Sequence, residues 1–108
     1  MNLKKFWQEE NICGGKQIGI FYLKENIPVN LLGIAISKKV ANSVYRNKIK
    51  RLIRENYRLL EEKLTVGNCF VILWNKNVQG KDVNFHIIKE DMEKLLKKAN
   101  ILLKEKDV

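Results

Sequence analysis

The chain has 108 residues, 45% of them hydrophobic, which suits one domain with one modest core and excludes a disordered basic tail. Lysine and arginine number 21 against 12 acidic residues, so the net charge is +9 and an anionic partner is expected. No apolar run reaches the roughly 18 residues of a membrane span, and the charged N-terminus lacks the core of a signal peptide.

Three segments have the composition of β-strands. Residues 18–24 (IGIFYLK) are rich in Ile, Phe and Tyr, and the turn-forming segment ENIPVN follows them. Residues 31–37 (LLGIAIS) predict a second, largely buried strand, and residues 69–74 (CFVILW) predict a third. Trp74 ends the third strand and is interpreted as a core residue rather than an RNA platform.

Two helices are expected. Gly and Pro are absent from residues 40–66, which predicts a helix over about 43–63 with Asn42 or Ser43 as its N-cap. A second helix is predicted over about 85–104, with Asn84 as a possible cap. Its helically spaced apolar residues should face the sheet, and they are Phe85, Ile88, Met92, Leu95, Leu96 and Ala99.

The first of these helices has two chemically different sides. At about 100° per residue, one side is apolar and comprises Tyr45, Ile49, Leu52, Ile53, Leu59 and Leu60. The adjoining side comprises Arg46, Asn47, Lys50, Arg51, Arg54 and Arg58. Residues 37–58 hold eight Lys or Arg and one acid, Glu55, whereas solvated faces usually mix the two signs. We therefore favour a polyanion site over a merely soluble face, and the planar fork of arginine suits phosphate.

Residues 33–58, GIAISKKVANSVYRNKIKRLIRENYR, resemble the signature of the bacterial ribonuclease P protein subunit. The match consists of a strand, then S-K-K, a short link containing Asn42 and Val44, and the helix motif R-N-K-x-K-R-x-x-R. The resemblance continues more weakly through residues 69–74 and the last helix. It implies a single α+β domain over residues 1–108, with a mostly antiparallel central sheet of the ribosomal-protein-S5-domain-2-like type.

The resemblance also implies a left-handed βαβ crossover that carries the basic helix. Physical reasoning from the residues predicts the opposite hand, because about 98% of such crossovers are right-handed. The segment 1–17 departs from the family pattern, with Glu9 and Glu10 in place of basic residues. Either the first helix is shortened or the start is late.

The implied activity is that of an endoribonuclease subunit that helps to remove the 5′ leader of precursor tRNA in the cytoplasm. The chemistry belongs to the RNA subunit and its magnesium, and no protein residue is catalytic. The implied partners are ribonuclease P RNA and precursor tRNA, with no membrane and no small-molecule substrate. By motif match, the residues that bind the RNA subunit are Ser37, Lys38, Lys39, Asn42, Arg46, Asn47, Lys48 and Arg51.

The resemblance places the single-stranded leader in a cleft between the sheet and the basic helix. The matching positions are Phe21, Lys50 and Arg54, with a weaker match at Trp7. Aromatic stacking combined with cations is the common way to hold single-stranded RNA. A core role for Phe21 remains open as an alternative, and so does one for Tyr22.

Two other functions compete with this interpretation. An independent protein nuclease would need a nucleophile, a base or a metal cluster, but His86 stands alone, and Asp82, Glu90 and Asp91 are interpreted as loop and helix surface. No metal site is predicted. A general RNA-binding or ribosomal-type protein is the second rival, and only the ordered motif argues against it. The widely spaced Cys13 and Cys69 are expected to be reduced thiols.

Overall fold

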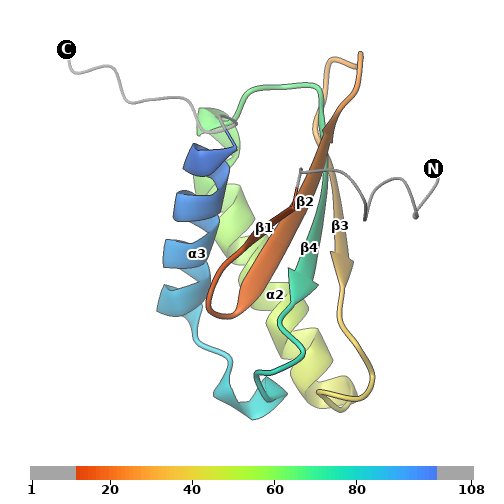
Figure 1. The fold of residues 1–108 in the computed structure, drawn as a ribbon, viewed down its shortest axis with the longest axis vertical. Helices are drawn as coiled ribbons and strands as arrows, with labels where there is room; N and C mark the ends of the chain where they lie inside the picture. Colours follow the sequence, from red (N-terminus) through yellow and green to blue (C-terminus); the bar gives the residue numbers. More distant parts are fainter. Residues whose placement is uncertain (1–11, 100–108) are drawn as a thin grey trace.

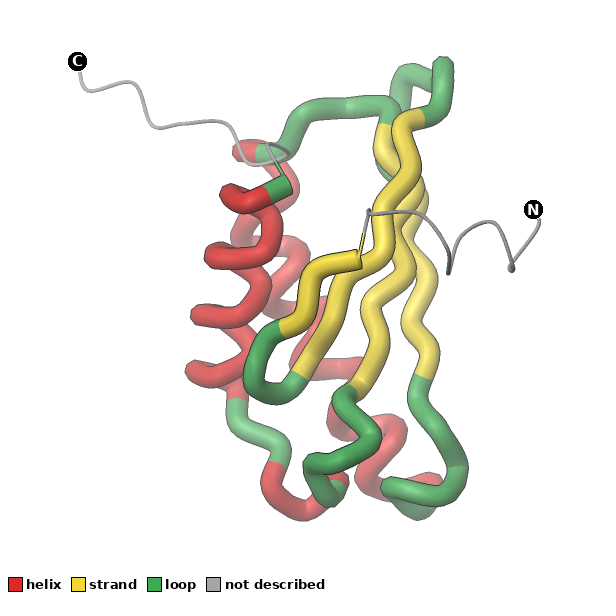
Figure 2. The backbone as a smooth tube through the Cα atoms, in the orientation of Figure 1, coloured by secondary structure: helices red, strands yellow, loops and turns green. Residues whose placement is uncertain are grey.

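The structure is a computed structural model that describes residues 12–99. One layer is a sheet and the other is a pair of helices that both cover the same face of that sheet (Figures 1 and 2). The strands are β1 (Ile12–Gly14), β2 (Ile18–Lys24), β3 (Leu31–Ala35) and β4 (Asn68–Trp74). The helices are α2 (Ser43–Leu60) and α3 (Phe85–Lys98), and 3₁₀ turns occupy Glu61–Lys63 and Gly80–Asp82.

The sheet has the strand order β1-β2-β4-β3. The β1–β2 and β2–β4 pairs are antiparallel, and the β3–β4 pair is parallel. Two parallel strands need a crossover connection. Here α2 provides it, because it follows β3 and precedes β4 along the chain and lies on the helical face of the sheet (Figure 1). The crossover is left-handed, as the resemblance implied and against the general rule. The mostly antiparallel α+β architecture is confirmed.

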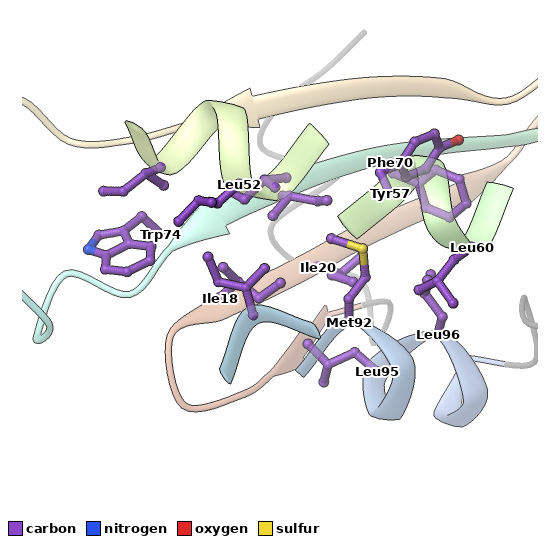
Figure 3. Close-up of a cluster of buried hydrophobic side chains, with 14 of the residues drawn as sticks. Ile18, Ile20, Leu52, Tyr57, Leu60, Phe70, Trp74, Met92, Leu95 and Leu96 are labelled. Carbon is purple, nitrogen blue, oxygen red and sulfur yellow. The ribbon is translucent and has the colours of Figure 1, made fainter. Parts of the chain in front are cut away.

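The core lies between the sheet and the two helices (Figure 3). Alternate residues of the strands point into it, such as Ile18 and Ile20 of β2 and Phe70 of β4. Ile49 and Ile53 of α2 are completely buried against them. Each large side chain buried in this way contributes about 1.5 to 3 kcal/mol, which fixes the orientation of α2 about its own axis.

Most predicted elements are confirmed, with small changes at their ends. The strand over 18–24 has the expected bounds, whereas the strand predicted over 31–37 ends at Ala35 and the third begins at Asn68. The helix predicted over 43–63 is α-helical to Leu60 and finishes as a 3₁₀ turn. Residues 100–104 of the last predicted helix lie outside the described residues. Trp74 is buried, as expected.

Two expectations about single positions are wrong, and one short strand was not expected. Leu59 is 59% exposed because it lies beyond the edge of the buried stripe of α2, where Asn56 and Tyr57 are buried instead. Asp91 is 5% exposed and not part of the helix surface. Strand β1 was not predicted, because a segment of three residues carries no usable alternation of polar and apolar residues.

Asp91 joins α3 to the turn between β1 and β2. Its carboxylate accepts hydrogen bonds from three backbone N–H groups, those of Lys16 (3.0 Å), Gln17 (2.7 Å) and Ile18 (3.2 Å). A Cβ atom at Gly15 would lie 2.6 Å from the Asp91 carboxyl carbon, so only glycine allows this close approach. A charged acceptor for three donors explains why a carboxylate is buried here.

Replacement of this carboxylate should destabilise the fold. We expect Asp91→Ala to lower the free energy of unfolding by about 1.5 to 3 kcal/mol, because buried backbone donors lose a charged acceptor. Urea denaturation measures the change, and Glu90→Ala, at the exposed neighbouring position, is the matched control. Equal unfolding midpoints for the two variants would contradict the assigned role.

Candidate nucleic-acid interface

The loop before α2 and the first turn of this helix are fixed by local hydrogen bonds. Asn42 is the N-cap, and its Oδ1 accepts from the backbone N–H of Tyr45 at 3.0 Å. The Ser37 hydroxyl accepts from the N–H of Lys39 at 3.2 Å, and Arg46 Nη1 donates to the Ala41 carbonyl at 2.9 Å. These hydrogen bonds fix the backbone of the loop that carries Lys38 and Lys39. Of the two N-cap candidates, Asn42 and Ser43, the structure selects Asn42.

The residues predicted to bind the RNA subunit are all accessible. Arg46 is half-buried, and the others are exposed, namely Ser37, Lys38, Lys39, Asn42, Asn47, Lys48 and Arg51. Because residues two apart on a helix lie about 200° apart, Arg46 and Lys48 occupy opposite flanks of α2, with Asn47 and Arg51 between them. The set covers the exposed half of the helix, and the apolar half is sealed against the sheet.

Like charges crowd this half of α2. Arg46, Lys50, Arg54 and Arg58 follow each other at intervals of four residues, which costs a few tenths of a kcal/mol per pair. An ion pair joins Arg51 Nε to Glu55 Oε1 at 3.8 Å, but both side chains are at least half exposed, so the contact is weak. Burial of Ile49 and Ile53 outweighs the repulsion and holds the cations together in the absence of a polyanion.

The residues predicted to bind the leader are not brought together. Lys50 and Arg54 lie in the cationic row of α2. Phe21 is 1% exposed, and strand alternation directs it to the face of the sheet opposite the helices. Phe21 is buried without belonging to the core between the sheet and the helices, and its leader-binding role stays a prediction. Tyr22 is half-buried and packs against the helical core, and Trp7 lies outside the described residues.

The predicted cleft between the sheet and the basic helix is also wrong for the described residues. Side chains of the core fill that space, with Ile49 and Ile53 from α2 and Phe70 and Ile72 from β4. The apolar side of α2 has to be buried for the helix to be held, and the contact leaves no room for a nucleic-acid strand.

A groove of about 610 Å³ lies instead at the end of the sheet where β3 and β4 finish. Its floor includes a row of paired positions that crosses all four strands, Gly14, Gly19, Leu73 and Ala35. Three of these four residues are small, so the surface is hollowed. Ser37 and Lys76 lie among its lining residues. The sequence carries no signal for this groove, because the floor residues come from four separate segments and only strand pairing aligns them.

Titratable and thiol groups elsewhere have ordinary structural surroundings. Burial raises the pKa of Tyr57 and the charge of Glu61 raises it further, while a hydrogen bond with Asn30 lowers it. His86 is exposed and Cys69 is a free thiol. Within residues 12–99, no three His, Cys, Asp or Glu residues are grouped so that they could hold a metal ion. Neither α2 nor α3, the helices of the described region, is apolar enough over its length to span a membrane.

The chain folds as a small α+β domain, and one of its helices, α2, exposes a cationic half. The family model "Ribonuclease P" matches residues 3–100, and the chain belongs to this family. The chain is 36% identical over 96 residues to the ribonuclease P protein component of Caldanaerobacter subterraneus, covering 89% of this chain and 81% of that protein. Its identity to the component of Clostridioides difficile is 32% over 101 residues, covering 93% and 87%.

Solved structures agree with this assignment. The Staphylococcus aureus RNase P protein superposes with a TM-score of 0.76 at 27% identity, covering 93% of this chain and 90% of that one. The Thermotoga maritima RNase P protein gives the same TM-score at 23% identity, covering 90% of each chain, and supports the fold. The chain is therefore of the class that forms the protein subunit of an endoribonuclease.

The hydrogen bond of Arg46 separates its role from that of Arg51. We expect Arg46→Ala to lower the free energy of unfolding by about 1 kcal/mol, because the Ala41 carbonyl loses its guanidinium donor. Arg51→Ala should leave stability within about 0.5 kcal/mol, since its side chain is exposed. Thermal or urea unfolding compares the two, and a larger loss for Arg51→Ala would overturn the distinction.

Proposed function

We propose that this chain is the protein subunit of the ribonucleoprotein that removes the 5′ leader of precursor tRNA. Family membership supports the activity, and one structural observation supports the mechanism. That observation is the cationic half of α2, which is held exposed because the apolar half is buried. The proposed partners are ribonuclease P RNA and precursor tRNA, and the proposed compartment for this reaction is the cytoplasm.

The basic half of α2 and the loop before it bind the RNA subunit in this proposal. Arginine and lysine neutralise phosphates and release the counterions that had condensed on the RNA. Arg51 and Arg54 can donate two parallel hydrogen bonds to one phosphate, whereas Lys48 offers a point charge. Arg46 uses one nitrogen for the Ala41 carbonyl, so its remaining donors are available to the RNA.

Magnesium fits a position on the RNA rather than on this chain. The exposed half of α2 offers cations and one carboxylate, Glu55, which already faces Arg51. Such a surface repels a metal ion and attracts the phosphates that bind one. In this proposal magnesium held mainly by the RNA subunit supplies the activated water, and the protein residues bind and orient RNA.

We assign the 5′ leader to the groove at the ends of β3 and β4. Its floor of small residues leaves room for an extended strand, and Ser37 and Lys76 add polar contacts. Ser37 also belongs to the loop that leads into α2, so the leader and the RNA subunit would meet neighbouring surfaces. This assignment differs from the predicted leader site at Phe21, whereas Lys50 and Arg54 remain with the RNA-binding half of α2.

A general RNA-binding protein without a processing role is the alternative. The basic surface alone suits either function, because phosphate contacts carry no information about sequence or reaction. Family membership favours the processing role, and an activity assay separates the two.

Reconstitution tests the proposed function directly. Addition of this chain to a bacterial ribonuclease P RNA at low magnesium should restore cleavage at the mature 5′ end of precursor tRNA. The chain alone should leave the precursor intact, and an unrelated basic protein of similar charge is the control for nonspecific neutralisation. Binding of the RNA without any stimulation of cleavage would support the general RNA-binding alternative.

Filling the groove should impair leader binding alone. We expect Ala35→Leu to lower the affinity of the reconstituted enzyme for leader-bearing substrate by about 1 to 3 kcal/mol, the value of one base contact. Affinity for mature tRNA should stay the same. Leu31→Phe is the control, because it enlarges an exposed residue on the same face of β3 outside the groove. An equal loss for both RNAs would instead indicate damaged packing.

A further inference from the structure

A second cavity lies beside the N-terminus of α2. It has a volume of about 500 Å³, within the range of about 300 to 1,000 Å³ typical of ligand pockets. One wall is formed by residues 39–42 together with Tyr45, and the other by residues 76–81, the loop that follows β4. The second wall begins at Lys76, 22 residues after the basic motif ends at Arg54, and has no place in that motif.

The two walls are locked together by backbone contacts. Gly80 N–H donates to the Val40 carbonyl at 3.1 Å. A Cβ atom at Gly80 would lie 2.6 Å from Ala41 Cβ and 3.0 Å from Tyr45 Cβ, so the walls meet as closely as glycine permits. Trp74 Nε1 donates to the Val78 carbonyl at 2.8 Å and anchors the loop to the end of β4. The cavity is therefore a built feature of the fold.

The lining of this cavity carries one sign of charge. Lys39 lies on the first wall, and Lys76 and Lys81 lie on the second. No aspartate or glutamate is among the lining residues. All three lysines are exposed side chains around a concave surface, and the free N–H groups of a helix N-terminus add to the attraction for an anion. A phosphate group is the anion that such a cluster suits.

We propose that this cavity binds backbone phosphates of the RNA subunit, and that Lys76 and Lys81 are RNA-binding residues in addition to those of the motif. The inference rests on the proposed function. Continuity selects folded RNA as the occupant, because Lys39 and Asn42 belong both to the cavity wall and to the predicted RNA-binding surface. The footprint of the RNA then extends from α2 across the N-terminus of the helix to the loop after β4.

The test compares two doubly substituted proteins with the same loss of charge. Lys76→Gln with Lys81→Gln alters the cavity. The control, Lys89→Gln with Lys94→Gln, alters exposed positions of α3 that do not line it. Binding of full-length ribonuclease P RNA, without substrate, is measured against salt concentration. We expect the cavity variant to bind more weakly and its log–log salt slope to fall by about 0.9 per lost phosphate contact, about 1.8 in all.

Equal affinities and slopes for the two variants would overturn the proposal. Hydroxyl-radical footprinting adds a spatial test, in which the cavity variant should lose protection at one cluster of RNA nucleotides and retain it elsewhere. A uniform loss of protection would count against a local site. Unfolding temperatures should match that of the unsubstituted chain, because the substituted lysines are exposed. If the unsubstituted chain neither binds the RNA nor stimulates cleavage, the proposed function fails, which is a different result from failure of the cavity alone.

Discussion

The packing of α2 on the sheet is the contact on which the rest of the molecule depends. Ile49 and Ile53 are completely buried, and that burial fixes which half of the helix faces outward. The cations of the exposed half repel one another and would not gather without this constraint. The parallel pairing of β3 and β4 requires the chain to cross over between them, and the crossover is the helix that carries the cations. The packing of α2 on the sheet therefore determines both the fold and the position of the charged surface.

The rest of the chain holds this arrangement by a few long-range contacts. Asp91 ties α3 to the turn between β1 and β2 through three backbone donors. Gly80 brings the loop after β4 against the N-terminus of α2. Both contacts involve residues that look unremarkable in the sequence, an acid on a helix and a glycine in a loop. Each matters because the backbone of another segment passes directly against it.

One face of the sheet is covered by the helices, and the two hollows of the surface lie elsewhere. The helical face is filled by the core, so no nucleic acid can lie between the sheet and α2. The groove at the ends of β3 and β4 is hollowed by small residues, and the lysine-lined cavity lies beside the start of α2. Lys76 and Asn77 contribute to both hollows. The short loop after β4 therefore separates the proposed leader site from the proposed RNA-subunit site, and contacts both.

The sequence by itself determined the local elements and the basic helix, because composition and helical spacing are properties of neighbouring residues. It predicted the strand over 18–24, the cap at Asn84 and the cationic row from Arg46 to Arg58. The left-handed crossover followed from family resemblance alone. Only the tertiary structure decided the burial of Phe21 and Asp91, the groove floored by Gly19 and Ala35, and the position of Lys81 beside Lys39. Each of these features depends on contacts between segments that are distant in the sequence and are brought together by strand pairing or loop packing. The spacing of residues within one segment gives no information about such contacts.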